Sequence, residues 1–371
     1  MRTINVAVIG AGWFGDVHSE CYLRAQSMLP DVKINLHTVV DIYEPAAIKC
    51  KEKYRFDRYT TDWHEVIDDP EIDLVDVCTD NKFHREMSIA AIERGKHVFC
   101  EKPLADTVED AEEMTDAAEK AGVTNMVDFH YRKIPALAQL HDLIQAGELG
   151  RIYHIKGMFL QDFGFDSPMT WRFKKALSGG GSIVTMGSHV IDAVRYLVGE
   201  IDEVCSVGET FIEKRTDPNT GKEDSCDVDD AMTVLLKFKN GAIGMLMTSW
   251  LAHGCRHHHE LEVYGEKGSA KFNSERLNEL ELWLDDPKSP LNGKKTVLIG
   301  RGNPYGELFN LKTGMGVGVK ESITIQMRDM IEGIVTGKDE TPSFHDGMMA
   351  VKVTSAIIKA ADTHTWVKVP E

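Results

Sequence analysis

The sequence has little that could build a disulfide framework or a metal site. Its seven cysteines are odd in number, are spread widely along the chain and include no Cys-x-x-Cys pair. This pattern favours reduced thiols over a disulfide network or a zinc knuckle. No cluster of cysteines indicates a metal centre, and we expect none.

Positive charge and long apolar runs are also scarce. Lys and Arg total 42 against 59 Asp and Glu, which gives a formal net charge of −17 at pH 7. Such a surface repels phosphate backbones and anionic membranes, so neither nucleic acid nor a membrane is an expected partner. The longest apolar stretches, such as 245–252, fall well short of a bilayer span. Residues 1–5 lack the pattern of a signal peptide and lead into a first strand, so we expect a cytoplasmic protein.

The chain does contain two different patterns of predicted secondary structure, one in each half. The 371 residues, 42% of them hydrophobic, suffice for two cores of ordinary size. Up to about residue 126, short β-branched runs alternate with helical stretches, which is typical of βαβ units in a parallel sheet. Beyond about residue 150 the strands are longer and alternating, with Asn240-Gly241 as a hairpin turn, which favours a mostly antiparallel sheet. The predicted strands are 6–9, 38–40, 74–78, 98–100 and 125–128 in the first part, and 152–159, 231–239, 242–248 and 260–264 in the second.

A glycine-rich turn follows the first predicted strand directly. In Gly10-Ala11-Gly12-Trp13-Phe14-Gly15, the first glycine allows a tight turn and the second lets a pyrophosphate approach the backbone N–H groups of a helix. The third permits close packing of that helix on the strand. Asp41 ends the next strand, at the spacing where an acidic side chain accepts hydrogen bonds from an adenosine ribose. An acidic group there repels a 2′-phosphate and favours NAD over NADP; the alternatives are an ordinary turn and a solvated strand end.

Two further loops follow predicted strands of this half, at the edge where ligands bind. The first contains Thr79-Asp80-Asn81 and His84, and His84 could equally be a helix-cap or surface histidine. The second is Cys100-Glu101-Lys102-Pro103. Partial burial and the positive charge of oxidised nicotinamide would both lower the pKa of Lys102, towards values that suit a hydroxyl-proton acceptor. The expected cofactor-binding residues are Gly10, Gly12, Trp13, Phe14, Gly15, Asp41, Thr79, Asn81, His84, Glu101 and Lys102.

These motifs together resemble the Gfo/Idh/MocA oxidoreductases, the group of glucose-fructose oxidoreductase and inositol dehydrogenase, over nearly the whole chain. The resemblance implies an α/β protein with a Rossmann domain over 1–126. It also implies an α+β domain over 127–371 that carries a large, mostly antiparallel open sheet, and the last helix, 344–361, is interpreted as packing back on the first domain. NAD-dependent hydride transfer on a sugar or polyol, and a homodimer or homotetramer formed through the open sheet, are implied as well.

A second glycine-rich stretch, 179–182, leads into a predicted helix over 183–198. Thr185, Ser188, His189 and Asp192 share one face of that helix, opposite an apolar stripe. A polar helix face is usually just solvated, but this one also suits a site that must hydrogen-bond several sugar hydroxyls.

The resemblance adds a contrast on this helix. In the family an aspartate usually lies four residues before the histidine, and both touch the reacting sugar; this chain keeps His189 but has Thr185 where the aspartate is expected. A threonine hydroxyl can position a substrate oxygen but is no useful general base near pH 7. We therefore expect Lys102 and His189 to be the acid/base groups, with Thr185 and Asp192 orienting neighbouring hydroxyls.

Several other side chains are candidates for sugar contact. His130 and Arg132 lie in a segment that resembles the family's connection between the domains, and Trp171 with Arg172 could stack on a sugar and hold its oxygens. Interface packing is the alternative for both pairs. In the run 257–259, His257 and His259 would share one strand face. A metal there would need a further ligand, so a solvated or substrate-contacting strand end is the preferred interpretation.

The leading hypothesis is an NAD-dependent oxidoreductase that removes a hydride from a ring hydroxyl carbon of a sugar or glycoside. Oxidation at C3 of a glucoside or of a C-glycoside fits this hypothesis. A redox-neutral lyase, glycosidase or oxidoreductase pair with tightly bound NAD is one alternative, and a non-catalytic NAD or sugar sensor is another. The sequence does not name the sugar, the oxidised carbon, the direction of the reaction or the oligomer.

Overall fold

The computed structural model describes residues 1–309, 312, 314–338 and 340–371. Within them the chain forms two compact units, each built from two separate stretches of sequence. Residues 1–133 and 318–351 make the first unit, and residues 134–317 and 352–371 make the second. The linear division after residue 126 does not include the return of 318–351 to the first unit.

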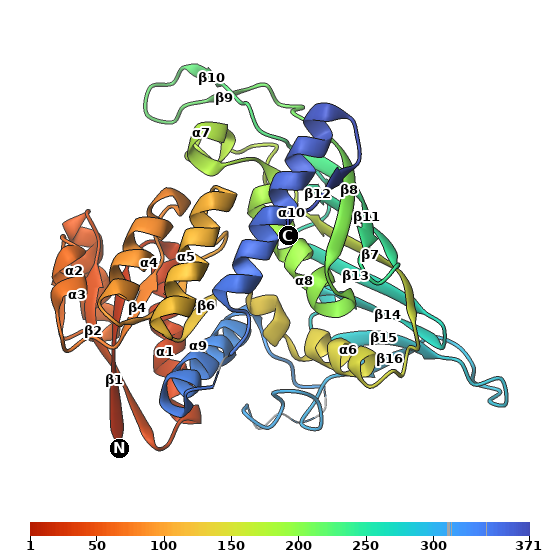
Figure 1. The fold of residues 1–371 in the computed structure, drawn as a ribbon, viewed down its shortest axis with the longest axis horizontal. Helices are drawn as coiled ribbons and strands as arrows, with labels where there is room; N and C mark the ends of the chain where they lie inside the picture. The colour runs from red at the N-terminus through yellow and green to blue at the C-terminus, as the bar shows by residue number, and fades with distance from the viewer. Residues whose placement is uncertain (310–311, 313, 339) are drawn as a thin grey trace. The chain divides into compact units, whose positions relative to one another are not determined.

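The first unit contains a six-stranded parallel sheet in the order β3-β2-β1-β4-β5-β6 (Figure 1). The order reverses between β1 and β4, which is the switch point where ligands bind in doubly wound sheets. The strands are β1 (Arg2–Ile9), β2 (Val32–Val40), β3 (Arg58–Thr60), β4 (Leu74–Val77), β5 (His97–Cys100) and β6 (Asn125–Val127). The helices are α1 (Trp13–Ala25), α2 (Glu44–Tyr54), α3 (His64–Asp68), α4 (His84–Glu93), α5 (Val108–Ala121) and α9 (Val319–Thr336), with short turns η1 (Gln26–Met28), η2 (Asn81–Phe83) and η3 (His130–Lys133).

The core of this unit joins its two stretches of sequence. Ile4, Val6 and Val8 of β1 are fully buried, and Met327 and Ile331 of α9 belong to the same apolar cluster. Burying such side chains stabilises a fold by about 1.5–3 kcal/mol each. The late helix α9 is therefore a structural part of the N-terminal unit.

The second unit contains a nine-stranded sheet in the order β16-β15-β14-β13-β7-β12-β11-β8-β17. Its pairs are antiparallel except for the parallel pair β7 and β12. Helix α8 contacts β7, and helix α6 contacts β14 and β15, so these helices cover one face (Figure 1). The strands are β7 (Ile152–Leu160), β8 (Ile201–Glu209), β11 (Ala231–Phe238), β12 (Ile243–Ser249), β13 (His258–Gly265), β14 (Gly268–Asn273), β15 (Glu279–Leu284), β16 (Lys295–Leu298) and β17 (Val367–Lys368), with a separate hairpin of β9 (Lys214–Thr216) and β10 (Glu223–Ser225). The helices are α6 (Pro135–Gln145), α7 (Lys175–Ser178) and α8 (Ser188–Val198), with η4 (Trp171–Phe173), η5 (Ile183–Gly187) and η6 (Ser274–Arg276).

Helix α10 (Phe344–Thr363) belongs to both units, since its residues up to Val351 fall in the first and those from Lys352 in the second. Within the first unit, the N–H of Phe344 donates to Asn125 Oδ1 at 2.8 Å. Within the second, Ser206 of β8 donates to the carbonyl oxygen of Ile357 at 2.6 Å. Among the described residues, no helix is both long enough and apolar enough to cross a membrane.

The fold class predicted from the sequence is confirmed, and each predicted strand is present. The Asn240-Gly241 turn joins β11 to β12, with Gly241 at φ +86°. The strands β3, β8, β9, β10, β14, β15 and β16 were not among the predicted ones, and of these β3, β9 and β10 hold only three residues each.

Candidate functional site

The glycine turn between β1 and α1 requires glycine at two of its positions. Gly10 has φ +103°, and a Cβ there would lie 2.6 Å from the carbonyl oxygen of Cys78. A Cβ on Gly15 would lie 1.8 Å from the carbonyl oxygen of Gly10. Gly12, by contrast, faces open space. The turn therefore packs tightly against the sheet on one side and leaves room for a ligand on the other.

The start of α1 is suited to an anion. Gly12 is its N-cap residue and provides no side-chain acceptor for the first N–H groups of the helix. Trp13 is 68% exposed and Phe14 is half-buried, so the entrance to the helix is accessible. Unpaired N–H groups at a helix N-terminus bind phosphate groups well.

Asp41 is held beside this turn by two backbone groups. Its Oδ2 accepts a hydrogen bond from the N–H of Ala11 at 2.8 Å, and its Oδ1 accepts one from the N–H of Tyr43 at 2.8 Å. Each carboxylate oxygen retains a further lone pair for another donor. The structure therefore places an acceptor suited to ribose hydroxyls directly at the glycine turn.

His84 joins two loops of the same sheet edge. It is fully buried, with Nδ1 3.0 Å from the carbonyl oxygen of Pro103 and Nε2 3.1 Å from that of Thr79. Burial lowers the pKa of His84, although the hydrogen bonds to the two carbonyl oxygens oppose this shift. The interpretation of His84 as a surface histidine is wrong, because its polar atoms face these two carbonyls. Asn81, which is also buried, begins the short turn η2 in the first of the two loops.

Lys102 follows the carboxyl end of β5 and is half-buried. Its backbone N–H donates to Oε2 of Glu101 at 3.0 Å, and its peptide bond to Pro103 is cis. Glu101 is only 4% exposed. A buried carboxylate thus lies directly beside the lysine predicted to carry the chemistry.

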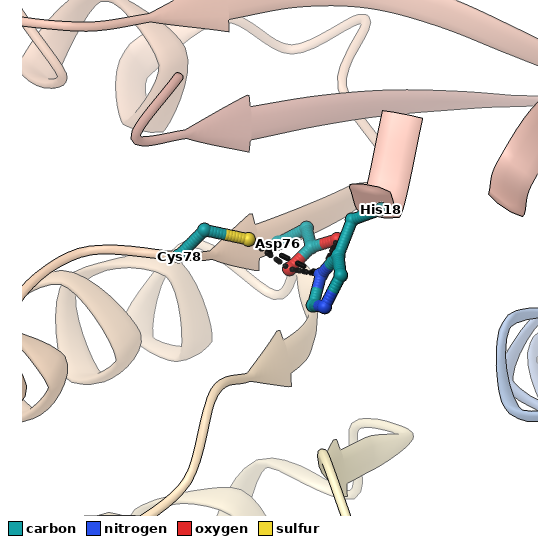
Figure 2. Close-up of side chains that lie close together, drawn as sticks. All are labelled: His18, Asp76 and Cys78. Carbon is teal, nitrogen blue, oxygen red and sulfur yellow. Dashed lines mark hydrogen bonds and ion pairs between the residues drawn. The ribbon is translucent and has the colours of Figure 1, made fainter. Parts of the chain in front are cut away.

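Beneath this edge lies a buried cluster of ionisable groups that the sequence analysis did not identify. His18 of α1 is fully buried, and its Nδ1 is 3.0 Å from Oδ2 of Asp76 and 3.1 Å from Sγ of Cys78 (Figure 2). Its Nε2 is 3.2 Å from Oε1 of Glu101 and 3.6 Å from Oδ2 of Asp128. Because ionised carboxylates only accept hydrogen bonds, carboxylates on both sides require a proton on both ring nitrogens.

The electrostatics of the cluster agree with a charged His18. Burial alone would lower the pKa of His18, but the facing Cys78 and Asp76 outweigh burial and raise that pKa well above its ordinary value. Burial also raises the pKa of Cys78 well above its ordinary value, so the thiol is neutral near pH 7 and Asp76 provides the attraction. Burial and the charge of Asp128 raise the pKa of Glu101. Despite burial, His130 and His18 hold the pKa of Asp128 well below its ordinary value.

The donor atoms of this cluster also lie close enough to be tested as a metal site. One group consists of a ring nitrogen of His18, a carboxylate oxygen of Asp76 and Sγ of Cys78, and these atoms lie within 4.8 Å of one another. A second group, within the same distance, consists of a ring nitrogen of His18 and a carboxylate oxygen each of Glu101 and Asp128. Their direct separations of 3.0–3.2 Å at Nδ1 are those of hydrogen bonds between the groups themselves. Hydrogen bonding therefore accounts for the arrangement at Nδ1, whereas Nε2 faces Oε1 of Glu101 as an ion pair. The sequence did contain one indication of this buried cluster, namely Asp76. A charged residue inside an apolar strand is unusual unless it is paired.

Two other candidates in the first unit have ion-pair partners of their own. His130 is buried, with Nδ1 3.2 Å from each carboxylate oxygen of Asp128. Arg132 is 5% exposed and donates from Nη2 to Oδ1 of Asp346 at 2.9 Å. These contacts give both residues a structural role in the turn η3.

The second unit carries the other predicted sugar-facing residues. The predicted helix 183–198 is present, but its first turn, η5, is π-helical and α8 follows directly. Ser188, His189 and Asp192 are buried, and Thr185 is half-buried. The usual interpretation of a polar face as solvated is wrong for this helix, because three of the four residues are buried.

An aromatic residue of β7 gathers three histidines in the same unit. The ring centroid of Phe159 lies 6.1 Å from that of His189, 5.0 Å from that of His257 and 5.2 Å from that of His259. His257 and His259 therefore both lie against Phe159, although β13 begins only at His258 and the strand pattern does not extend to His257. His258 points elsewhere and pairs with Glu275 at 3.1 Å.

Trp171 and Arg172 lie on the short turn η4 of the second unit. The guanidinium carbon of Arg172 is 4.6 Å from the centroid of the Trp171 ring. Both residues are half-buried. They form a stacked cationic and aromatic pair with part of its surface accessible.

Comparison with known proteins relates these features to a family. Residues 4–129 match an oxidoreductase family with an NAD-binding Rossmann fold, and residues 137–271 match the GFO/IDH/MocA C-terminal domain. The levoglucosan dehydrogenase of Pseudarthrobacter phenanthrenivorans is 36% identical over 387 residues, which cover 100% of this chain and 99% of that protein. The D-glucoside 3-dehydrogenase of Escherichia coli is 34% identical over 254 residues, 67% of this chain and 70% of its own.

Solved structures give the same grouping. A levoglucosan dehydrogenase in complex with NADH and L-sorbose matches with a TM-score of 0.97 at 36% identity, over 100% of both chains. A structure of the same enzyme with NADH and levoglucosan matches with a TM-score of 0.96 at 35% identity, again over 100% of both chains.

Proposed function

Because the chain belongs to the Gfo/Idh/MocA family of NAD-binding oxidoreductases, we propose that it oxidises a ring hydroxyl of a sugar or glycoside. The full-length similarity to levoglucosan dehydrogenase and the partial similarity to D-glucoside 3-dehydrogenase support a glucose-derived substrate. Oxidation at C3 of a glucoside, an anhydrosugar or a C-glycoside is the preferred reaction.

The residues of the first unit fit the cofactor that this function needs. Gly12 and the uncapped start of α1 leave open space and N–H donors for a pyrophosphate, and Asp41 offers acceptors for ribose hydroxyls. The negative charge of Asp41 disfavours a 2′-phosphate, so the proposed cofactor is NAD. When bound, NAD+ supplies the acceptor for the hydride that leaves the carbinol carbon.

The observation that carries the proposal is the placement of Lys102. It lies at the carboxyl end of β5, half-buried, with the buried carboxylate of Glu101 against its backbone N–H. As a neutral amine, Lys102 accepts the proton of the reacting hydroxyl while the carbon loses its hydride. A lysine ammonium formed there then releases the proton to solvent, which completes the balance of one hydride and one proton per alcohol oxidised.

The residues of η5 and α8 are proposed to hold the sugar. His189 is the second acid/base group, and Asp192 and Thr185 orient neighbouring hydroxyls. Thr185 has no ionisable proton near pH 7, so the proton transfer falls to Lys102 and His189. His130, Arg132, Trp171 and Arg172 remain candidates for sugar contact, with Trp171 and Arg172 the better supported because they are less buried.

The test is a panel of sugars, glycosides and anhydrosugars with NAD+, followed at the nicotinamide absorbance in the wild type and in Lys102→Ala. We expect the substitution to lower turnover by at least about 100-fold, because general base catalysis contributes on the order of 10²–10⁴. NAD binding should persist. Lys120→Ala is the matched control, since Lys120 is an exposed lysine in the last turn of α5 and should keep full activity. Near-normal turnover in Lys102→Ala would contradict the mechanism, and a panel without turnover but with retained sugar binding would favour a sensor.

The cellular setting and the assembly are part of the same proposal. All seven cysteines are unpaired, as suits a reducing cytoplasm.

On the second unit, Val207, Leu235 and Ile243 are 57%, 50% and 60% exposed on the neighbouring strands β8, β11 and β12. We propose that a second copy of this chain covers this part of the sheet. Lys237 and Glu203 on the same strands give the surface both a positive and a negative charge, so two copies related by twofold symmetry can be complementary to each other.

A further inference from the structure

One carboxylate outside the proposed site holds the helix that carries Thr185 and His189. Asp229 lies in the segment between β10 and β11. Its Oδ1 accepts a hydrogen bond from the N–H of Gly181 at 2.9 Å. Its Oδ2 accepts one from the hydroxyl of Ser182 at 2.7 Å and one from the N–H of Ile183 at 2.9 Å. Its own backbone oxygen accepts the N–H of Ser182 at 2.9 Å.

Three of these bonds take up backbone N–H groups where the helix begins, those of Gly181, Ser182 and Ile183. The first N–H groups of a helix have no partner within it. Ser182 is the N-cap residue, and its side chain makes no capping bond of the usual kind; its hydroxyl donates to Asp229 instead. A negative charge at this end also interacts favourably with the helix dipole. Asp229 therefore caps η5 and α8 from a segment 46 residues further along the chain.

The local sequence is adapted to this contact. A Cβ on Gly181 would lie 2.0 Å from the backbone oxygen of Asp229, so the close approach requires glycine. The hydroxyl of Ser182 also lies 2.8 Å from Oγ1 of Thr248, a fully buried residue of β12. The chain Asp229, Ser182, Thr248 thus connects the start of the helix to the central part of the sheet. The glycine-rich stretch 179–182 therefore has a structural role at the start of the helix, and this role does not require a bound phosphate.

We propose that Asp229 is a positioning residue for sugar oxidation. By fixing residues 181–183, it sets where the π-helical turn Ile183–Gly187 begins, and so where Thr185 and His189 present their side chains. π-Helical turns inside α-helices are rare and often occur at functional sites. This inference rests on the proposed function, because Thr185 and His189 matter to catalysis only if the protein oxidises a sugar.

The experiment compares Asp229→Asn with Asp227→Asn in the full-length protein. The asparagine keeps the size of the side chain but turns an NH₂ group towards donors that need an acceptor. Asp227 is the matched control because its Oδ1 accepts the N–H of Lys175 at 2.7 Å, so it holds the start of α7 from the same segment. With the best sugar of the panel, we expect kcat of Asp229→Asn to fall by about 10- to 100-fold, as misplaced reacting groups do. Asp227→Asn should stay within about twofold of the wild type.

Two readouts separate positioning from a loss of folded protein. The dissociation constant of NADH, measured by fluorescence, should be unchanged in Asp229→Asn, since its binding residues lie in the first unit. The primary isotope effect on kcat, with the sugar deuterated at the oxidised carbon, should rise because hydride transfer becomes rate-limiting. Ser182→Ala removes one of the four bonds, so we expect a smaller fall in kcat and a smaller rise in the isotope effect. This second variant keeps the test valid if Asp229→Asn is unstable.

The outcomes are distinct. A wild type that oxidises no sugar counts against the proposed function itself. An active wild type, with a folded Asp229→Asn whose kcat and isotope effect are unchanged, overturns only the role of Asp229. An equal loss in Asp227→Asn would also overturn it, because capping in this segment would then act through general stability.

Discussion

Two buried histidines, His84 and His18, show opposite pKa shifts. Burial lowers the pKa of His84 despite the two carbonyl groups that face it, whereas Cys78 and Asp76 outweigh burial and raise the pKa of His18. Both are buried histidines of one unit, so burial alone does not decide the direction of the shift. The direction depends on whether neighbouring charges outweigh burial, and the sequence shows such neighbours only where they are close along the chain.

Thr185 is the residue whose replacement best tests substrate choice. Thr185→Asp introduces a carboxylate four residues before His189, the arrangement that the family resemblance leads one to expect. We expect activity on polyols such as inositols to rise by at least about tenfold relative to the activity on glycosides, since an added acceptor of about 1.4 kcal/mol changes selectivity that much. The measurement is the ratio of kcat/KM for the two substrate classes.

The control for this experiment is Thr233→Asp, which places a carboxylate on a half-buried residue of β11. It should leave the ratio unchanged. If Thr185→Asp also leaves the ratio unchanged, while the protein folds and binds NADH normally, Thr185 contributes packing and not specificity.

At the scale of elements, helix α1 is held to the sheet by charge as well as by apolar contact. His18 connects α1 to Asp76 of β4, to Glu101 after β5 and to Asp128 after β6. Its folded-state pKa is raised, so its protonation contributes stability that is fully present below the unfolded pKa of about 6.5. That stability is lost as pH rises through the higher folded pKa.

His18→Gln should therefore destabilise the protein most at neutral pH and below. A glutamine donates on one side only and leaves buried carboxylates without a positive partner, which costs about 3–5 kcal/mol. Thermal unfolding followed between pH 6 and the alkaline range should show the wild type losing its advantage over the variant as pH rises. His97→Gln is the control: His97 lies at the opposite end of β5, its pKa is lowered by burial, and its stability difference should not shrink in the same way. A constant difference between His18→Gln and wild type at all pH values would argue against a charged His18.

The helix over 183–198 shows the limit of periodicity as a guide. Its apolar spacing predicted the span, because residues on one face recur at 3.6 positions. At the start of its π-helical turn, Ile183 and Ser182 are hydrogen-bonded to Asp229 and Thr248, which are distant along the chain. A local pattern contains no information about a cap that is supplied from another segment.

For the whole molecule, the exposed apolar area of the second unit's sheet makes self-association the property to test. Leu235→Glu places a charge in the exposed apolar area of the second unit's sheet, next to Val207 and Ile243. If a second copy covers this area, the variant should have the mass of a smaller species in light scattering coupled to size-exclusion chromatography, because a buried unpaired charge is costly. Leu291→Glu is the control, since Leu291 is 75% exposed and lies in the segment between β15 and β16. An unchanged mass for Leu235→Glu would exclude this surface as the interface.

The sequence alone determined the features that depend on short stretches of chain. Alternating apolar runs predicted the two kinds of sheet, and glycine spacing with Asp41 predicted the dinucleotide turn, because each pattern acts within a few residues or one βαβ unit. Tertiary structure alone decided the rest. It brought Asp76, Glu101 and Asp128 to His18, returned α9 to the first unit and placed Asp229 at the start of the helix over 183–198. Each of these contacts joins residues distant in sequence, and no local preference specifies which distant group completes a buried hydrogen bond.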